Sequence, residues 1–571
     1  MTWQEYSRRL AAANFRQKDL DFLEEVFEFA QKTHEDEFRA SGDPYITHAV
    51  AVSLKLAELK LDVASVAAGL LHDAGEQHPA SLKDIRKKFG DEIAFLVDAL
   101  TKVDKVKARG AERALESVKK MFLAVAEDIR VVVIKLADRL HNMETLEYLP
   151  KEKGERIARE TLSLYAPLAE RLGMWNLKGV LEDLSMKYIY PKEYSQISEE
   201  VKKRAPEREN FLKKIIPRIG QELEKEKIKT VEISSRLKHL YSTWRKLEKY
   251  ENDWKHLSDL IAIRIIVKDV KECYAALGVI HKLWKPVPGR FGDYIAIPKP
   301  NGYQSLHTSV FMEGGIMIEF QIRTPEMHRE AESGIAAHWA YSEAGKPKEG
   351  LKVIGKKFNW IKQLHEWHKE FEKEHPSSEE ALEALKIDFF KDRIFVLTPK
   401  GDVIDLPQGA TPLDFAYHIH SEVGNRASGA KINGRMVSFA RELRSGEMVE
   451  IVTQKNKKPS QEWLSLVKTS LAKNQIRRAL RLSPKESFLS LIERPVELQI
   501  YGKNRVGFIK DITSVFARAK INIQNLISAR SGSEEAPIRV SFIPKSQSEV
   551  EKITNTLKKI EGVSRITSKT K

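Results

Sequence analysis

The chain has 571 residues, a formal net charge of +15 and a single cysteine. Domains usually hold about 100–200 residues, so this length predicts several of them. The lone Cys273 excludes a disulfide framework and a zinc site built from several thiolates, and it favours a reducing compartment. No segment resembles a signal peptide or approaches the roughly 18 apolar residues of a membrane span. We therefore expect a cytoplasmic protein without membrane contact. The positive charge favours anionic partners, although a solvated basic surface would explain it equally well.

Helical periodicity dominates the first third of the chain. Apolar residues recur at i, i+3, i+4 and i+7 in the opening stretch, at Leu23, Val26, Phe27 and Ala30, and residues 20–194 continue in this way. They predict an all-α unit. Residues 199–227 indicate a charged helical connector. The alternating runs at 261–267 and 317–324 then indicate strands of a mixed α/β domain.

Shorter modules are expected in the second half. Polar and helical residues return between 346 and 386, and RIFVLTPKGDVIDLP predicts a hairpin that turns at residues 399–401. The β-rich module that it opens should end near residue 453. Residues 457–490 indicate a basic helical linker. VELQIYG, a helix around 508–519 and IRVSFIP then predict a final β/α module.

Four residues suggest a metal site in the helical unit. His72 and Asp73 interrupt an apolar helix, which alone is weak evidence because such a histidine is more often structural. His48 lies upstream, and Asp138 shares a helix face with Asn142 at i, i+4. Two imidazoles and two carboxylates form a mixed set that suits manganese, iron or zinc.

A second group of residues points to phosphoryl transfer. In MIEFQIRT, Glu319, Gln321 and Arg323 alternate with apolar residues, so a strand would place them on one face. A solvated strand face is the alternative. Asp259 precedes the strand at 261–267, and a carboxylate pair near cations is what magnesium-dependent transfer between polyanions requires.

Aromatic and basic residues extend this second group. Tyr303, after the Asn301–Gly302 turn, is an exposed aromatic candidate for stacking on a base, with a core tyrosine as the alternative. A helix-like run, SSRLKHLYSTWRKLEKY, contains cations suited to phosphates, although a solvated helix face would also explain them. These cations are Arg236, Lys238 and Arg245.

The ordered motifs resemble one family, the RelA/SpoT alarmone enzymes. FRASGDPYITHAV, LLHDAGEQ, IKLADRLHNMETL and YAPLAERLGMWNLKGVLEDL resemble its HD hydrolase domain. RLKHLYSTWRK, LSDLIAIRIIV, PGRFGDYIAIPKPNGYQSLHTSV and IEFQIRTPEMHREAESGIAAHW resemble its synthetase domain. RIFVLTPKGDVIDLPQGATPLDFAYHIH resembles its TGS domain, and the C-terminal segment from residue 493 resembles an ACT domain.

The resemblance implies a multidomain fold of α and α+β type. An all-α HD-type domain, a mixed α/β nucleotidyltransferase-like synthetase domain, a β-grasp TGS-like domain and a ferredoxin-like ACT domain would follow one another. The expected divisions are 1–195 (hydrolase), 196–345 (synthetase), 346–388 (helical linker), 389–455 (TGS-like), 456–492 (basic helical linker) and 493–571 (ACT-like).

The resemblance also implies roles in hydrolysis. His48, His72, Asp73 and Asp138 would bind Mn²⁺, with Glu76 and Asn142 at the catalytic water and Arg39 on the substrate. Three residues depart from the family pattern. Gln77 replaces a usual aspartate, Ala40 a lysine and Ala49 a proline, and Gln77 cannot accept a proton.

For synthesis, the resemblance implies transfer of the β,γ-pyrophosphate of ATP to the 3′-hydroxyl of GTP or GDP. Arg236 and Lys238 would bind ATP phosphates, and Asp259 and Glu319 would handle Mg²⁺ and the attacking hydroxyl. Tyr303 would stack on guanine, and the acceptor site would be lined by Asn301, His307, Gln321 and Arg323. Gly292 stands where bifunctional members commonly have a lysine, and Ser235 replaces a usual glycine, so acceptor preference stays open.

Three functional alternatives follow. The chain is a bifunctional synthetase and hydrolase of (p)ppGpp, a synthetase with a regulatory HD-type domain, or a non-catalytic RNA- or ribosome-binding regulator. Retention of Asp259, Glu319 and four metal-type ligands argues against the third. The TGS-like and ACT-like domains imply regulatory contacts, including tRNA or the ribosome, although Asn425 replaces a common histidine. The sequence does not define the oligomeric state.

Overall fold

The computed structural model describes fifteen stretches of the chain, and the candidate residues Glu76, Gln77 and Asp259 and the predicted linker 346–388 lie outside them. The described residues are 1–74, 81–104, 120, 127–249, 261–299, 301–312, 317–336, 393–481, 496–502, 505, 507–519, 521–528, 538–542, 553–558 and 560–570. The chain divides into two compact units, residues 1–395 with 401–407, and residues 396–400 with 408–571. None of the described helices has the length and apolar character needed to cross a bilayer.

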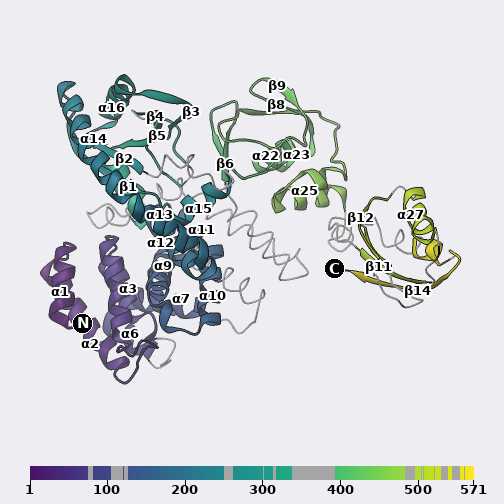
Figure 1. The fold of residues 1–571 in the computed structure, drawn as a ribbon. Helices are drawn as coiled ribbons and strands as arrows, with labels where there is room; N and C mark the ends of the chain where they lie inside the picture. Colours follow the sequence, from purple (N-terminus) through teal and green to yellow (C-terminus); the bar gives the residue numbers. More distant parts are fainter. Residues whose placement is uncertain are drawn as a thin grey trace. The chain divides into compact units, whose positions relative to one another are not determined.

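The first unit begins with helices (purple to blue in Figure 1). They are α1 (Trp3–Ala12), α2 (Gln17–Thr33), α3 (Ile46–Glu58), α4 (Val63–Leu71), α6 (Ser81–Phe89), α7 (Asp91–Asp104), α9 (Ile129–Glu144), α10 (Lys151–Glu160), α11 (Ala166–Arg171), α12 (Trp175–Ile189), α13 (Pro191–Lys203) and α14 (Ala205–Lys225). Leu23, Val26, Phe27 and Ala30 are the buried residues of α2, as their spacing predicts. The all-α prediction is confirmed over the described residues.

Burial in this helical part positions the first candidate site. Asp62 caps the N-terminus of helix α4, because its side chain accepts a hydrogen bond from the Ser65 N–H. The buried apolar run of the helix ends just before His72. Helices α3 and α9 are also largely buried. Polar side chains that these helices carry inward therefore meet in a desolvated region.

A five-stranded mixed sheet follows, in the order β1-β2-β5-β4-β3. Its strands are β1 (Thr230–Leu237), β2 (Ile261–Val267), β3 (Lys285–Asp293), β4 (Leu306–Phe311) and β5 (Met317–Arg323). Strands β2 and β5 are parallel, and the other pairs are antiparallel. Helices α14 and α16 (Val270–Leu283) pack on one face, against the apolar residues of β2 and β5.

The other face of this sheet carries polar side chains, as the alternation in β5 predicts. Ile318, Phe320 and Ile322 are fully buried against the helices, so Glu319 and Gln321 point the opposite way. The prediction that Arg236 and Lys238 lie in a helix-like run is wrong, and Lys238 lies just after β1. Arg236 lies on β1 and pairs with Ala262, because antiparallel pairing with β2 favours an extended backbone, and helix α15 (Leu240–Lys249) begins only after it.

The second unit contains two further modules. Strands β10 (Val449–Thr453), β8 (Ala427–Ile432) and β9 (Arg435–Val437) form a sheet in that order beside α22 (Pro412–Ile419). The last module orders its strands β12 (Ile523–Ser528), β13 (Ile538–Phe542), β11 (Val496–Gly502) and β14 (Val563–Thr570), with α27 (Phe508–Arg518) in its core. This order matches the predicted ferredoxin-like fold. The hairpin prediction is also confirmed, since β6 (Arg393–Leu397) and β7 (Val403–Pro407) form a two-stranded sheet.

Helices in the expected basic linker have an additional role. Trp463 of α24 (Trp463–Leu466) and Ile476 of α25 (Ser470–Leu480) are buried in one apolar cluster with Leu413 and Tyr417 of α22. Within the described part of the segment, residues 463–466 and 470–480 are helical as predicted. It packs as part of the module that precedes it because one face of α25 is apolar.

Candidate active sites

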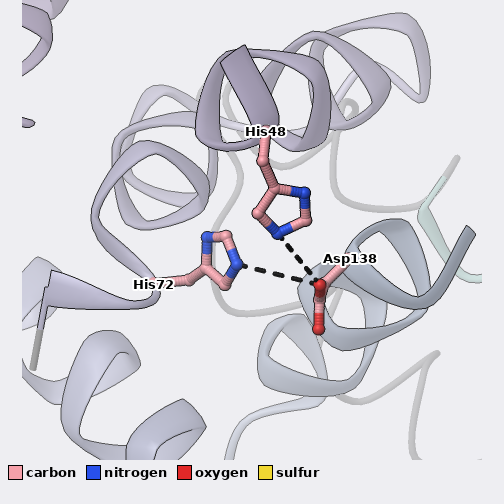
Figure 2. A group of neighbouring side chains, drawn as sticks. All are labelled: His48, His72 and Asp138. Carbon is pink, nitrogen blue, oxygen red and sulfur yellow. Dashed lines mark ion pairs between the residues drawn. The ribbon is translucent and has the colours of Figure 1, made fainter. Parts of the chain in front are cut away.

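Two histidines and an aspartate from three helices converge in the helical part (Figure 2). The Nε2 atom of His48, on α3, lies 3.2 Å from Oδ1 of Asp138, on α9. The Nε2 atom of His72, just after α4, lies 3.8 Å from the same oxygen. All three residues are buried, and their ligand atoms fall within 4.8 Å of one another, which suits a divalent metal ion.

Asp73 lies beside this cluster, as the sequence predicts. Its Oδ2 atom is 3.0 Å from Nε2 of His72 and accepts a hydrogen bond from the Tyr45 hydroxyl. Burial alone would lower the pKa of His72, but the Asp73 and Asp138 carboxylates raise it to about 9. Lys135 lies 2.7 Å from the other oxygen of Asp138, and a divalent cation would compensate the remaining negative charge of the two carboxylates. The donor set therefore fits a metal.

Sequence reasoning missed His141. Its Nδ1 atom lies 2.7 Å from Nδ1 of His48 and 2.9 Å from NH1 of Arg39. Burial, with the nearby His48 and Arg39, lowers the pKa of His141 to about 3, so its ring is neutral and the single lone pair of Nδ1 faces both neighbours. His141 thus lies behind His48, a member of the cluster. Its position next to Asn142 in KLADRLHNM was the available signal.

A cavity of about 350 Å³ opens beside the cluster. Five of its lining residues are basic: Arg39, Lys135, Arg139, Lys153 and Arg156. Arg139 stacks over Tyr165 at 3.9 Å, and Tyr165 ends a π-helical turn, a distortion often found at functional sites. Asn142 and Ala40 line the cavity as well. The arrangement suits a polyphosphate next to a metal.

The second site lies on the polar face of the five-stranded sheet. Strand register places Arg236 opposite Ala262, and Ala262 opposite Glu319, so these residues form one row across β1, β2 and β5. Oε2 of Glu319 lies 2.8 Å from the Lys238 ammonium, and Oε1 lies 3.2 Å from Nδ1 of His307. Burial alone would raise the pKa of Glu319, but His307 and Lys238 hold it well below its usual range. Glu319 is therefore an ionised carboxylate among cations.

A cavity of about 320 Å³ surrounds this row. The predicted residues that line it are Arg236, Lys238, Tyr303, His307, Glu319, Gln321 and Arg323. Sequence reasoning missed Lys246, Lys299, Lys178, Trp175 and Glu182, which line it too. Lys246 shares a helix face with Ser242, which the spacing of residues in α15 could have indicated, whereas Arg245 does not line the cavity.

Two predictions in this site need correction. Tyr303 was expected to be exposed, but it is only 8% exposed, because Trp175 packs edge-on against it at 5.8 Å and the Lys299 ammonium lies 5.3 Å from its ring. Asn301 does not line the cavity. Its side chain donates a hydrogen bond to the Glu170 carbonyl and accepts one from the Tyr303 N–H, so it holds the loop that carries Tyr303.

Family models match the chain in four consecutive stretches. They are the HD domain (residues 26–175), the region found in RelA / SpoT proteins (235–346), the TGS domain (394–453) and the ACT domain (496–562). The bifunctional (p)ppGpp synthase/hydrolase SpoT of Escherichia coli is 42% identical over 488 residues, which cover 85% of this chain and 68% of that protein. The chain belongs to the RelA/SpoT family.

Two further RelA/SpoT relatives show the same breadth of similarity. The guanosine-3′,5′-bis(diphosphate) 3′-pyrophosphohydrolase of Aquifex aeolicus is 46% identical over 477 residues, covering 83% of this chain and 67% of that protein. The GTP pyrophosphokinase of Myxococcus xanthus is 46% identical over 480 residues, which cover 83% of this chain and 62% of that protein. The chain thus spans about two thirds of the length of these RelA/SpoT relatives.

Two departures from the RelA/SpoT pattern lie close to these sites. Ala40 lines the first cavity next to Arg39, where a lysine would add a cation. Gly292, on β3, pairs with His307 on β4, and a Cβ atom there would lie 2.9 Å from the Tyr294 ring. A lysine at residue 292 would therefore require the tyrosine ring to move.

Proposed function

We propose that this protein both synthesises and hydrolyses (p)ppGpp in the cytoplasm. The observation that carries the proposal is the presence of two separate polar sites, one suited to metal-dependent hydrolysis and the other to pyrophosphoryl transfer. One is a buried His-His-Asp cluster beside a basic cavity, and the other is an ionised glutamate surrounded by cations on a sheet face. The relatives from Myxococcus xanthus and Aquifex aeolicus are named as a pyrophosphokinase and a pyrophosphohydrolase, and these two activities agree with the two sites.

In synthesis, the 3′-hydroxyl oxygen of GTP or GDP attacks the β-phosphorus of ATP. The bond between that phosphorus and the oxygen on the α-phosphate breaks, and AMP leaves. Arg236, Lys238 and Lys246 neutralise the ATP phosphates, and Glu319 takes the hydroxyl proton. His307 and Lys238 keep Glu319 ionised before that step. Tyr303 then stacks on guanine after Trp175 and Lys299 have moved away from it.

Acceptor contacts complete this site. His307, Gln321 and Arg323 line the cavity on strands β4 and β5 and would contact the guanine nucleotide, with Asn301 acting through its loop. Mg²⁺ would be held by Glu319 and by Asp259, which lies outside the described residues. The ion supplies charge neutralisation between two polyanions.

In hydrolysis, His48, His72, Asp73 and Asp138 would hold Mn²⁺. The ion supplies Lewis acidity toward the 3′-pyrophosphate and its attacking water. Arg39 lies 2.8 Å from Oδ1 of Asn142, so the two form one edge of the cavity where the substrate phosphates would bind. Glu76, outside the described residues, would take the proton of the water.

A pair of nucleotide assays on the full chain tests the proposal. ATP with GTP or GDP and Mg²⁺ should yield AMP and alarmone, and ppGpp with Mn²⁺ should yield GDP and pyrophosphate. Synthesis without hydrolysis, with manganese shown to be bound, would favour a synthetase with a regulatory helical domain. The failure of both reactions would favour a non-catalytic regulator.

The second unit would serve regulation. Its TGS-like and ACT-like modules are consistent with contacts that control the catalytic half, and we propose tRNA or the ribosome as one such partner. The excess of positive charge supports an RNA partner. Co-sedimentation of the full chain with ribosomes carrying deacylated tRNA, at low and at high salt, tests this contact.

A further inference from the structure

Helix α12 contributes one face to the synthetase cavity, although it precedes the residues matched by the synthetase family model. Trp175, Lys178, Gly179 and Glu182 line the cavity, and they recur at i, i+3, i+4 and i+7. This spacing places all four on one side of the helix. The helix is therefore part of the wall around the proposed ATP site.

The next residue, Asp183, connects this helix to β1. Its Oδ1 atom accepts a hydrogen bond from the Tyr241 N–H at 2.9 Å, and its Oδ2 atom lies 2.8 Å from Nδ1 of His239. The other ring nitrogen of His239, Nε2, lies 3.2 Å from NH2 of Arg236. A continuous chain of hydrogen bonds thus runs from α12 through His239 to Arg236.

The chemistry of the end groups decides where the proton of the ring lies. A carboxylate only accepts hydrogen bonds, and a guanidinium only donates them. His239 can satisfy both only as the neutral ring with its proton on Nδ1 and a lone pair on Nε2. Asp183 therefore fixes the tautomer and the plane of the imidazole, as carboxylates do for metal-binding histidines.

Gly179 makes this approach sterically possible. A Cβ atom at Gly179 would lie 2.1 Å from Cδ2 and 2.2 Å from Nε2 of His239. Real Cβ atoms do not come so close to a ring, so any side chain there would displace the imidazole. Helix and ring are thus fitted to each other.

We propose that Asp183 is a positioning residue for synthesis. It orients His239, and His239 in turn holds the Arg236 side chain beside Ala262 and Glu319 on the polar face of the sheet. The inference rests on the proposed function, because it takes Arg236 to bind ATP phosphates. Neither Asp183 nor His239 lines the hydrolase cavity. We therefore expect a substitution of Asp183 to act on synthesis.

Asp183→Asn tests the proposal. The carboxylate of Asp183 accepts hydrogen bonds from the Tyr241 N–H and from the His239 ring. In either orientation, the NH₂ group of the new asparagine faces one of these two donors, so the asparagine cannot accept both hydrogen bonds. The affinity of the full chain for α,β-methylene ATP with Mg²⁺, an analogue whose α–β bond cannot be broken, should fall about tenfold, the effect of one hydrogen bond to a charged group. In turnover, KM for ATP should rise by a similar factor, while KM for GTP and hydrolysis of ppGpp stay unchanged.

Gly179→Ala should act in the same direction without altering any polar group. Its matched control is Gly278→Ala, in helix α16, where a Cβ atom would meet nothing within 4 Å. Equal analogue affinity for wild type and Gly179→Ala would overturn the proposal.

A double-mutant cycle separates positioning from general packing. In an Arg236→Ala background, Asp183→Asn should not lower the affinity for the analogue any further, because the side chain that Asp183 positions is already gone. Additive losses, or no analogue binding by the wild type, would overturn the positioning role. Wild-type analogue binding without alarmone formation would instead contradict the proposed function.

Discussion

Asn142 lies one helical turn after Asp138, and its side-chain amide donates a hydrogen bond to Oδ1 of Asp138 at 2.6 Å. The oxygen that faces both histidines of the cluster is thus also the oxygen that Asn142 orients. Because the other end of the amide accepts from Arg39, this side chain links the metal cluster to the substrate cavity.

We expect Asn142→Ala to lower ppGpp hydrolysis by about 10–100-fold, the usual effect of removing an outer-shell partner of a metal ligand. Synthesis by the same preparation should not change. Asn210→Ala, an exposed position on α14, is the matched control. Pyrophosphate release from ppGpp with Mn²⁺ is the measurement, and unchanged release in Asn142→Ala would contradict the role given to this residue.

His72→Ala should remove bound manganese. The imidazole provides one of the ligand atoms of the cluster, so its loss leaves fewer ligands to hold the ion. Elemental analysis after dialysis against Mn²⁺ should show metal loss in His72→Ala and none in His420→Ala, an exposed histidine of the second unit. Unchanged metal content in both variants would show that the cluster is not a metal site.

Glu319→Gln should reduce alarmone synthesis by about 10²–10⁴-fold, because the amide can neither take the hydroxyl proton nor balance Lys238. Glu326→Gln, at an exposed position of α17 (Pro325–Ser333), is the control. AMP formation from ATP and GTP measures the effect. Asp259→Asn should have a similar effect, and wild-type synthesis by either variant would refute its metal or base assignment.

Gln77→Asp should hydrolyse ppGpp faster than the natural protein. A bound cation lowers the pKa of its water without help, whereas a well-placed acid/base group adds about 10²–10⁴-fold, so Gln77 should slow hydrolysis without abolishing it. Residue 77 lies outside the described structure, and its role stays a prediction. Equal initial rates of pyrophosphate release would place Gln77 away from the reaction.

Local periodicity accounts for what the sequence predicts well. The i, i+3, i+4, i+7 spacing in α2 and the alternation in β5 each assign the buried face correctly, since burial imposes a period of about 3.6 on a helix and of 2 on a strand. His72 and Asp73 stand out because they interrupt an apolar helix, whereas His48 and Asp138 follow from their context and from the resemblance to the family. The ferredoxin-like and TGS-like folds followed from resemblance.

What the sequence did not predict depends on contacts between distant segments. Arg236 becomes part of a strand only through pairing with β2, and Tyr303 is covered by Trp175 from a helix far earlier in the chain. No local pattern encodes either partner. For the same reason the lysines of α12 and of the loop at residue 299 were missed, although both line the synthetase cavity.

Glu182 on α12 is a buried carboxyl whose charge is poorly compensated. It is 9% exposed, and its Oε2 atom has no hydrogen-bond partner among the described residues. The Lys178 ammonium lies 3.5 Å from the Oε1 atom of Glu182 and is shared with Glu170. Burial therefore outweighs the attraction of Lys178 and raises the pKa of Glu182 to about 7.

A pH-dependent stability follows from this shift. A carboxyl with a raised pKa keeps its proton in the folded chain after the unfolded chain has lost it, so the stability that it contributes is complete below about pH 4.5. That stability is lost as the pH rises through about 7. The glutamine side chain of the Glu182→Gln variant cannot lose a proton. As the pH rises from 5 to 8, we therefore expect the free energy of unfolding of the variant to increase by about 1–3 kcal/mol relative to that of wild type.

Melting temperatures of the first unfolding transition, recorded at several pH values, measure this difference in stability. The exposed Glu152→Gln on α10 should follow the wild-type profile. Parallel profiles for Glu182→Gln and wild type would mean that Glu182 is already ionised at pH 5, with Lys178 as its full partner.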